Sequence, residues 1–505
     1  MKKLQVLFIS ILSMSTFYGQ DITDALRYSQ SEIQGTARFR ALSGAFGALG
    51  GDMSAVSINP AGAAVFTQSH ASFSLSNAEV DNHTRYFNGL GSTSESNFDI
   101  HQGGAVFVFA SNNSSPWKKF TLGIAYDKTN NFDDNWFAFG TNTNSNNFNN
   151  TIASYFFDYA DGLRFDEISA FDGETLAQAY QEIGSVYGFG NQQAFLGYES
   201  FILDPEFNTD DNTSYLINLG EGNFNHDYSV VSTGYNGKIS FNVATQYEDN
   251  LYLGLNINSH FIDYQRSNLL FEENSNGSDV DFIEFENNLS TTGTGFSFQL
   301  GGILKLSPEF RVGLTYDSPT WFTIEEESTQ YLGTDGINGF VEINPQVVNI
   351  FPEYKIKTPS KVTGSLAYIF GQKGLISFDY STKDYSKTEF RPTSDPAFAD
   401  ENNFIGNTLT DAATYRFGGE YKHKQFSFRG GYRFEESPYA NGLTVGDLTG
   451  YSLGLGYNFG NTKLDLTYDQ SERSFETPLY SIGLIDTVSI DRTNSNITLS
   501  LSFNI

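Results

Sequence analysis

A strict alternation of apolar and polar residues constrains this chain more than any other feature, and it runs to the last residue. The C-terminal segment NITLSLSFNI, residues 496–505, alternates its polar residues with the apolar set Ile497, Leu499, Leu501, Phe503 and Ile505. A period of two places the apolar side chains on one face of a β-strand and the polar side chains on the other. The chain therefore ends in a strand with one apolar face and one polar face.

The same alternation recurs along most of the chain, in about fourteen segments of roughly ten residues each. Segments 120–126, 239–247 and 451–459 are clear examples. About ten residues is the length that a tilted strand needs to cross a bilayer, and an even number of strands allows the sheet to close. A soluble sandwich or propeller would bury a second apolar layer, whereas the opposite faces here carry Ser, Thr, Asn, Gly and charged residues. We predict an all-β fold, a transmembrane antiparallel β-barrel of about 14 strands.

Charge and composition exclude several classes of function. Lys and Arg total 29 against 59 Asp and Glu, a net charge of -30, so a nucleic-acid partner is excluded because the phosphate backbone would repel the chain. The chain has no Cys, which removes disulfides, thiolate metal sites and Cys nucleophiles. Its 6 His are scattered, and no phosphate loop or nucleophile motif is present. We therefore predict no enzymatic activity, no cofactor and no metal site.

The N-terminus is typical of an exported protein. The segment MKKLQVLFISILSMSTFYGQ places two lysines before an apolar stretch and ends in small and polar residues. We expect a signal peptide over residues 1–19, the alternative being a retained membrane anchor. No later segment is long and apolar enough for a transmembrane helix. These features predict a barrel in the outer membrane of a Gram-negative bacterium, inserted by the barrel-assembly machinery and surrounded by outer-membrane lipid.

Two segments interrupt the alternating pattern. Residues 20–68 are rich in Gly and Ala, and their side chains are too small to form a core of their own. Because a barrel of about fourteen strands is too wide for its wall side chains to fill, we predict that this segment is a hatch that plugs the lumen. Residues 69–505 form the barrel, with a long insert at about 130–228 that we expect to be extracellular. The insert includes two expected short helices, at 151–160 and 175–187.

The insert begins with an Asn-rich stretch that also carries aromatic residues. Asn and Asp are calcium ligands, but a calcium loop that starts at Asp127 fails because Phe132 stands where Gly is required. We therefore interpret this stretch as a solvated loop.

The mature chain resembles the FadL-type outer-membrane transporters of long-chain fatty acids and other hydrophobic compounds, TodX-like proteins included. The segment GTARFRALSGAFGALGGDMSAVSINPAG is similar to the hatch of that family, with its Asn-Pro-Ala signature at Asn59, Pro60 and Ala61. The similarity continues through FRVGLTYDSPTWFTIEEE, IKTPSKVTGSLAYIF and DAATYRFGGEYKHKQFSFRGGYRFEESP. The resemblance implies passive uptake: a hydrophobic small molecule is captured from outside, the hatch rearranges, and the ligand leaves sideways through the wall.

A second function stays open at this point. Some FadL-like barrels, the PorV type, resemble this chain in the hatch yet act as scaffolds for protein secretion or surface attachment. An apolar path through the lumen would favour transport, and an exposed apolar patch on the insert would favour a scaffold. In either case we expect a monomer.

Candidate site residues follow from the hatch and from the polar face of the wall. We assign hatch geometry and gating to Gly50, Gly51, Asn59, Pro60, Ala61 and Gly62. Alternation turns Arg416, Glu420, Arg429 and Arg433 into the lumen. Arg40, Arg416 and Arg429 are predicted either to bind a carboxylate head group or to form a salt-bridge network that holds the hatch in the barrel. In GGAVFVFA both faces are apolar, and Phe107 and Phe109 are predicted to line an apolar ligand path, the alternative being that the inner face packs on the hatch.

Overall fold

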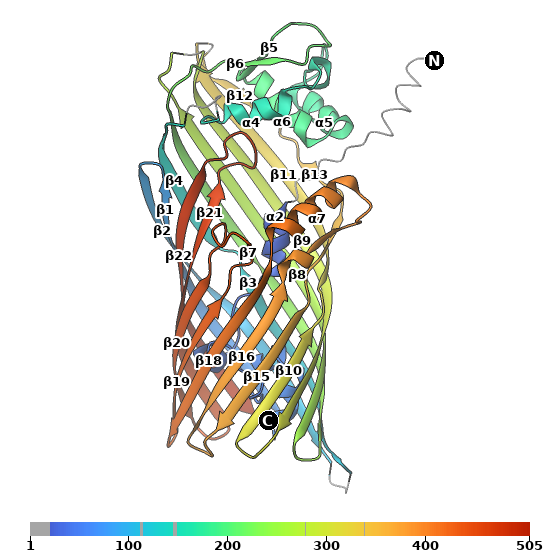
Figure 1. Ribbon diagram of the computed structural model, residues 1–505, viewed down its shortest axis with the longest axis vertical. Coiled ribbons are helices and arrows are strands. Elements are labelled where there is room, and N and C mark those ends of the chain that lie inside the picture. Colours follow the sequence, from blue (N-terminus) through green and yellow to red (C-terminus); the bar gives the residue numbers. More distant parts are fainter. Residues whose placement is uncertain (1–20, 112–114, 145–148, 278, 338) are drawn as a thin grey trace, which may run out of the picture.

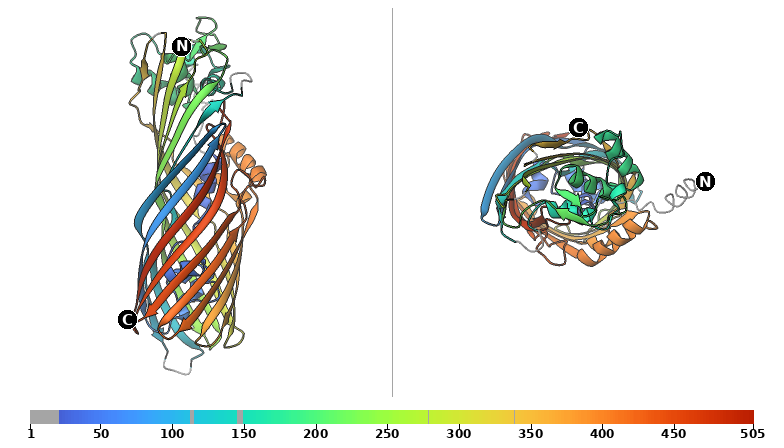
Figure 2. Two further views of the ribbon diagram at one scale, coloured as in Figure 1. Left: turned by 90° about the vertical axis from the view of Figure 1, so that its left-hand side faces the viewer. Right: turned by 90° about the horizontal axis from the view of Figure 1, so that it is seen from above.

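The computed structural model describes residues 21–111, 115–144, 149–277, 279–337 and 339–505. It is a tall, closed antiparallel β-barrel with helices inside it and across one end (Figures 1 and 2). The expected signal peptide at residues 1–19 lies outside the described residues. Within the described residues, no helix is both long and apolar enough to cross a bilayer.

Fourteen antiparallel strands form the wall when shorter strands placed end to end are counted as one, which confirms the predicted fold. The long wall strands are β1 (His70–Tyr86), β2 (Gly89–Ala110), β3 (Trp117–Asn131), β7 (Phe224–Tyr247), β8 (Leu251–Glu273), β9 (Val280–Lys305), β21 (Thr462–Pro478) and β22 (Thr487–Asn504). The shorter ones are β10 (Phe310–Asp317), β15 (Lys361–Ile369), β16 (Gly374–Asp384), β18 (Asp411–His423), β19 (Phe426–Glu435) and β20 (Leu448–Asn458).

Further strands continue the wall above four of these positions. They are β4 (Asp134–Asn142), β11 (Trp321–Gly336), β12 (Val341–Ile343), β13 (Asn349–Ile350), β14 (Tyr354–Lys357) and β17 (Glu389–Arg391). The wall is taller on the side of the long strands β7, β8 and β9 than on the side of β15 to β20 (Figure 1).

The alternating sequence pattern decides which face of each strand meets lipid. The last strand, β22, pairs with the first, β1, from His70↔Asn504 to Arg85↔Ser489, and this closes the barrel. Leu499 and Leu501 are exposed on the outside, whereas Thr498 and Ser500 are buried inside. Closure matters because a bilayer core offers no water to satisfy the backbone groups of an open strand edge.

The N-terminal segment lies inside the barrel, toward the end where the turns between strands are short (Figure 1). It consists of α2 (Ile22–Ser29), α3 (Ala37–Ala41) and two short 3-10 helices, η1 (Ser54–Ser57) and η2 (Pro60–Val65). Each helix begins at a polar capping residue or a proline where the sequence supplies one. Asp21 caps α2, Thr36 caps α3, and Asn59 precedes the proline that opens η2. We call residues 21–68 the hatch.

A helical cap covers the opposite end of the barrel (Figure 2). Its elements are α4 (Ala153–Ala160), η3 (Phe165–Glu167), α5 (Leu176–Val186), α6 (Phe189–Glu199) and the hairpin β5 (Leu203–Pro205) with β6 (Tyr215–Ile217). Aromatic residues such as Tyr155, Phe156 and Phe285 pack the cap against the tall side of the wall. The expected helices at 151–160 and 175–187 are therefore present as α4 and α5.

The structure corrects the expected insert at about 130–228 at both ends. Residues 134–142 form the strand β4, and β7 begins at Phe224, so both segments belong to the wall. The Asn-rich stretch is therefore not a solvated loop in this part. Its aromatic residues explain the difference, because Trp136 is buried against the cap while Phe137 and Phe139 alternate to the outside. A further helix, α7 (Pro396–Thr408), follows η4 (Tyr385–Lys387) and β17 and lies at the side of the barrel (Figure 1).

Candidate functional site

The six residues assigned to the hatch geometry form one compact unit. The Gly51 amide donates to the Gly62 carbonyl at 3.1 Å. A Cβ atom at Gly50, whose φ is +62°, would lie 2.9 Å from the Gly62 Cα atom, so only glycine fits there. The Oδ1 atom of Asn59 accepts a hydrogen bond from the Ala61 amide at 3.1 Å. Its Nδ2 atom donates to the carbonyls of Gly47 and Gly302, at 2.7 and 3.1 Å. Asn59 thus connects two parts of the hatch to the wall strand β9.

Wall glycines allow the hatch backbone to approach the strands closely. A Cβ at Gly254 of β8 would lie 2.3 Å from the carbonyl carbon of Pro60. A Cβ at Gly313 of β10 would lie 2.4 Å from the carbonyl oxygen of Gly47. These distances are shorter than any real Cβ contact, so the hatch can occupy this position against the wall only if both wall residues are glycine.

Lumen-facing side chains of the wall satisfy the carbonyl groups of the hatch. Examples of such bonds to hatch carbonyls are Lys119 to Ala64, Asn242 to Pro60, Asn256 to Val56, Gln299 to Ser57 and Arg311 to Leu49, at 2.8 to 3.0 Å. In the other direction, Asp379 of β16 accepts from the amides of Phe46 and Gly47, at 3.0 and 2.9 Å. An irregular backbone inside the barrel needs such partners, because an unpaired buried polar group costs about 1–3 kcal/mol.

Ion pairs fix the hatch at two further points and involve two of the predicted site arginines. Arg40 of α3 is 1% exposed and forms a two-pronged pair with Asp469 of β21, at 2.8 Å for both bonds. Arg429 of β19 lies between Glu420 and Asp465, at 2.7 and 2.6 Å, and Arg38 of the hatch reaches the same Glu420 at 3.1 Å. Arg40 and Arg429 are thus engaged by carboxylates, which supports the salt-bridge alternative for both.

The structure places Phe107 and Phe109 on the outer face of the barrel, where they are 49% and 55% exposed. The expected inward orientation is therefore wrong. Val106 faces the lumen instead, is fully buried and packs with Met53 and Val56 of the hatch. The reason is that both faces of this segment are apolar, so alternation could not tell the lipid face from the hatch face.

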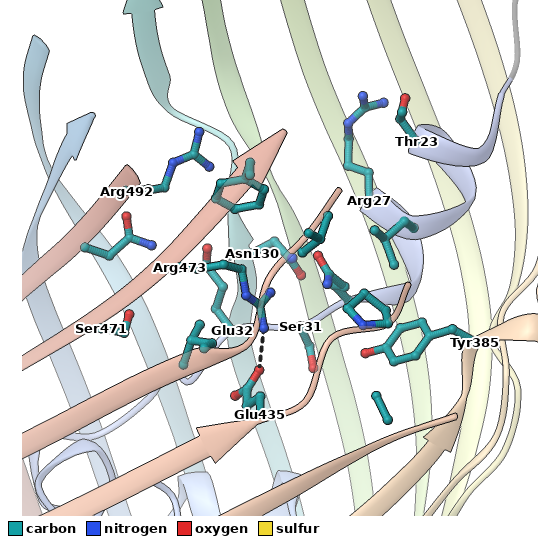
Figure 3. Close-up of a pocket in the computed structure, with 18 of the residues that line it drawn as sticks. Thr23, Arg27, Ser31, Glu32, Asn130, Tyr385, Glu435, Ser471, Arg473 and Arg492 are labelled. Atoms are coloured by element: carbon teal, nitrogen blue, oxygen red, sulfur yellow. Dashed lines mark ion pairs between the residues drawn. The ribbon is translucent and has the colours of Figure 1, made fainter. Parts of the chain in front are cut away.

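A cavity of about 920 Å³ lies in the lumen beside the hatch, below the cap. One side of it is apolar, formed by Ile22, Leu26, Phe404, Tyr439 and Phe475. The other side is charged and includes Arg416, the remaining predicted site arginine, together with Lys361, Lys383, Arg433, Glu435 and Arg473. Figure 3 shows Arg473 and Glu435 paired at this side, with Arg27 of α2 farther along the cavity.

No pattern in the sequence predicts the grouping of Lys383 and Arg473 with Arg416. Strand alternation gives the inward face of each strand, but it does not give the register between strands. The register places Lys383 opposite Lys361 and Arg416 opposite Arg433, and the closed barrel brings these side chains and Arg473 to the lining of one cavity.

The ladder of backbone hydrogen bonds around the wall is interrupted on one side of β2. Its neighbour there is β3, followed by β4. The ladder of β2 with β3 runs only from Gln102↔Asp127 to Ala110↔Lys119. Above it, β2 pairs with β1 alone and β4 pairs with β7 alone among the described residues. We call this interruption the ladder gap.

Side chains replace the missing backbone bonds of the ladder gap. Lys128 and Asp99 form an ion pair at 2.9 Å across it, and Asn97 donates to Asp133. The strand β4 lies on the lumen side of β1, because the inward-facing side chain of Thr84 donates to the Phe137 carbonyl at 2.6 Å. Residues 130–134 of this break also line the cavity.

Comparison with known families identifies the chain. A family model described as outer membrane protein transport protein (OMPP1/FadL/TodX) matches residues 208–474, more than half of the 505 residues. The chain belongs to this family. Membership makes it a transport protein rather than an enzyme and places it in the outer membrane of Gram-negative bacteria, as the sequence predicted.

Solved structures share the barrel of this FadL/TodX family member. A FadL homologue of Pseudomonas aeruginosa has a TM-score of 0.54 at 11% identity and covers 94% of this chain and 99% of its own. The toluene transporter TodX of P. putida has a TM-score of 0.52 at 12% identity, with the same shares of both chains. At such identities the likeness concerns the fold alone. A search of curated proteins finds no match.

Proposed function

We propose that this FadL/TodX family member takes up hydrophobic small molecules, such as long-chain fatty acids, across the outer membrane by passive diffusion. The cap end faces the outside, the ligand rests in the cavity beside the hatch, the hatch rearranges, and the ligand leaves sideways through the ladder gap. The observation that carries this proposal is that residues 130–134 line the cavity and also form the break in the wall.

The apolar side of the cavity supports a ligand with a hydrophobic body. Ile22 and Leu26 come from α2 of the hatch, and Phe404 comes from α7. Because α2 belongs to the hatch, displacement of the hatch changes the shape of the cavity. Arg416 is the site arginine that we assign to a polar contact with the ligand, since Arg40 and Arg429 are engaged elsewhere.

The hatch also closes the route straight through the lumen. Its small residues pack against wall glycines, and its carbonyls are bonded to the wall, so a polar solute finds no water-filled channel at that level. The ladder gap is held by side chains instead of a continuous backbone ladder. A few side-chain bonds are easier to open than a continuous ladder of backbone hydrogen bonds, so the wall yields first at this place.

A cysteine lock tests the exit through the ladder gap. The chain has no Cys, so Asn97→Cys with Asp133→Cys introduces one possible disulfide across the gap. Uptake of radiolabelled oleate by cells that produce this variant should fall several-fold under oxidising conditions and recover on reduction. The matched control is Thr363→Cys with Ser381→Cys, whose hydroxyls lie 2.9 Å apart on strands that are already paired.

The control lock should leave uptake unchanged. Equal uptake by the oxidised and reduced forms of the gap variant would contradict lateral exit through the gap. Native mass spectrometry of protein extracted gently from its own membrane then identifies the bound species. Lipidic acids or aromatic compounds support uptake, whereas a stoichiometric protein partner with an empty lumen would point to a scaffold.

A further inference from the structure

Five cationic side chains gather on the charged side of the cavity, each from a different wall strand. They are Lys361 of β15, Lys383 of β16, Arg416 of β18, Arg433 of β19 and Arg473 of β21. In the strand register Lys361 lies directly opposite Lys383, and Arg416 lies directly opposite Arg433. Like charges directly opposite each other on adjacent strands destabilise a sheet. Two such pairs in a chain of net charge -30 indicate that this cluster has a role beyond the fold.

The carboxylates beside the cluster do not balance it. Asp317 pairs with Lys361 at 2.8 Å, and Glu435 is shared by Arg433 and Arg473 at 3.4 and 3.5 Å. Two carboxylates thus form ion pairs with three of the five cations.

Two further carboxylates nearby are bonded to backbone amides. Asp379 accepts from the amides of the hatch, and Glu436 accepts from the Ala413 amide at 2.9 Å. Lys383 donates to the Ser29 carbonyl of the hatch, a bond that leaves its charge uncompensated. Because a carboxylate bonded to amides keeps its charge, the five cations stand beside four carboxylates, but neither Lys383 nor Arg416 has a carboxylate within ion-pair distance among the described residues.

The guanidinium groups of the cluster also have donors to spare. The Nε atoms of Arg416 and Arg473 are buried and lack a hydrogen-bond partner among the described residues. A guanidinium presents a planar fork of N–H donors that matches the oxygens of a phosphate or carboxylate group. Lys383 and Arg416 are the two cations of the cluster without an ion pair among the described residues. A doubly charged phosphate group matches two cations in charge and offers more acceptor oxygens than a carboxylate does.

We propose that the cavity binds a phosphate-type dianionic group at the cluster of Lys361, Lys383, Arg416, Arg433 and Arg473, with any apolar body of the ligand against α2 and α7. The site distinguishes a dianion from a monocarboxylate. The inference deepens the proposed uptake function and rests on it for its role in the cell, but binding is measured on purified protein without transport. A failure of binding is therefore distinguishable from a failure of uptake.

The test is isothermal titration of the full-length protein in a neutral detergent at constant ionic strength. The probes are hexyl phosphate, hexanoate, hexanol and inorganic phosphate. Hexyl phosphate should bind about tenfold more tightly than hexanoate, and hexanol should not compete with it. If inorganic phosphate binds as tightly as hexyl phosphate, the ligand is a free phosphate, and if it binds more weakly, the ligand is a phosphorylated amphiphile.

Two variants should change the affinity for hexyl phosphate in opposite directions. Arg416→Gln with Arg473→Gln should weaken the binding of hexyl phosphate by about tenfold or more. Glu435→Gln removes the carboxylate that competes for Arg433 and Arg473, and it should tighten binding. The control for loss of an arginine outside the cavity is Arg164→Gln, at an exposed arginine of the cap that pairs with Asp166.

Two results would overturn the proposal. One is equal affinity of the wild-type protein for hexyl phosphate and hexanoate. The other is unchanged affinity in the double arginine variant, provided that it keeps the barrel. If the double variant does not fold, a failure of Glu435→Gln to tighten binding overturns the proposal instead.

Discussion

Asn59 shows how much a single side chain can connect inside a barrel. Its amide nitrogen donates to carbonyls of the hatch and of β9, and its oxygen caps the helix η2. Pro60 follows at the first position of η2, where its missing N–H costs nothing. Neither residue contributes to the pairing of wall strands, so a change at this corner acts on the hatch and leaves the barrel closed.

Asn59→Ala combined with Pro60→Ala should impair uptake while the barrel stays folded. Two buried carbonyls lose their donor, at a cost of about 1–3 kcal/mol each to the seated hatch. The measurement is oleate uptake, with heat-dependent gel mobility as the check on barrel folding. Asn208→Ala, at an exposed position of the cap, is the matched control. Unchanged uptake in the double variant would exclude a gating role for this corner.

At the level of elements, the contact between the hatch and the wall is decided by where the strands carry glycine. The closest approaches occur at Gly254 and Gly313, where a side chain would meet the hatch backbone. Elsewhere, a wall glycine such as Gly364 of β15 would place its Cβ in open space. The first kind of glycine is required by the hatch, and the second is not.

Gly254→Ala should shift the hatch and make the outer membrane leaky. The new Cβ would lie 2.3 Å from the carbonyl carbon of Pro60, so the backbone of η2 has to move. Entry of a polar antibiotic that wild-type cells exclude reports the leak. Gly364→Ala is the matched control, because its Cβ meets nothing within 4 Å. Equal antibiotic sensitivity of the two variants would argue against a tight seal at Pro60.

The contact of α2 with α7 should weaken as the pH rises. Burial raises the pKa of Glu401 on α7 to about 7, with nearby Asp21 adding to the effect. Burial also raises the pKa of Asp24 on α2, opposed by Arg27 and reinforced by Glu326. A carboxyl group whose folded-state pKa lies above its unfolded value stabilises the folded form fully below the unfolded pKa, about 4.5 for Glu. That stability is lost as the pH passes through about 7.

Hydrogen exchange of the amides of Ile22–Ser29 measures this effect. After correction for intrinsic rates, protection should be severalfold lower at about pH 8 than at about pH 5.5. Glu401→Gln should reduce the difference, because the glutamine stays neutral across this range. A protection factor that is the same at both pH values would refute the pH dependence.

For the whole molecule, the barrel is closed by hydrogen bonds and filled by its own N-terminus. The pairing of β1 with β22 closes the ring without any contribution from the hatch. The hatch fills the lumen at the level of the short turns, and the cap packs across the other end (Figures 1 and 2). The cavity lies between these two plugs and meets the wall at the ladder gap.

Deletion of residues 21–67 should convert the protein into an open channel. The lumen face of the wall is lined with Ser, Thr, Asn and charged residues, which water can hydrate once the hatch is gone. Single-channel conductance in planar bilayers should rise from near zero to a stable open level. A closed deletion variant that still shows the β-sheet signal in circular dichroism would mean that the cap alone seals the barrel.

The sequence by itself determined the wall. Alternation along segments such as 451–459 fixed the number of strands and the lipid face, because a period of two leaves one choice wherever only one face is apolar. It was wrong for Phe107 and Phe109, where both faces are apolar. Alternation also did not identify β4, whose residues were predicted to form a polar loop. In the structure β4 lies on the inner side of β1.

Tertiary structure alone decided the site. The sequence identified Arg40, Arg416 and Arg429 as inward cations, but the partner of Arg40 lies 429 positions away, and those of Arg429 depend on the register between strands. The closed sheet also brought Lys383, Arg416 and Arg473 to the lining of one cavity, and it ended the β2–β3 ladder at Gln102. A local pattern specifies which way a side chain points. The contacts of that side chain are specified only by the closed sheet, because the pairing with neighbouring strands sets the position of each strand.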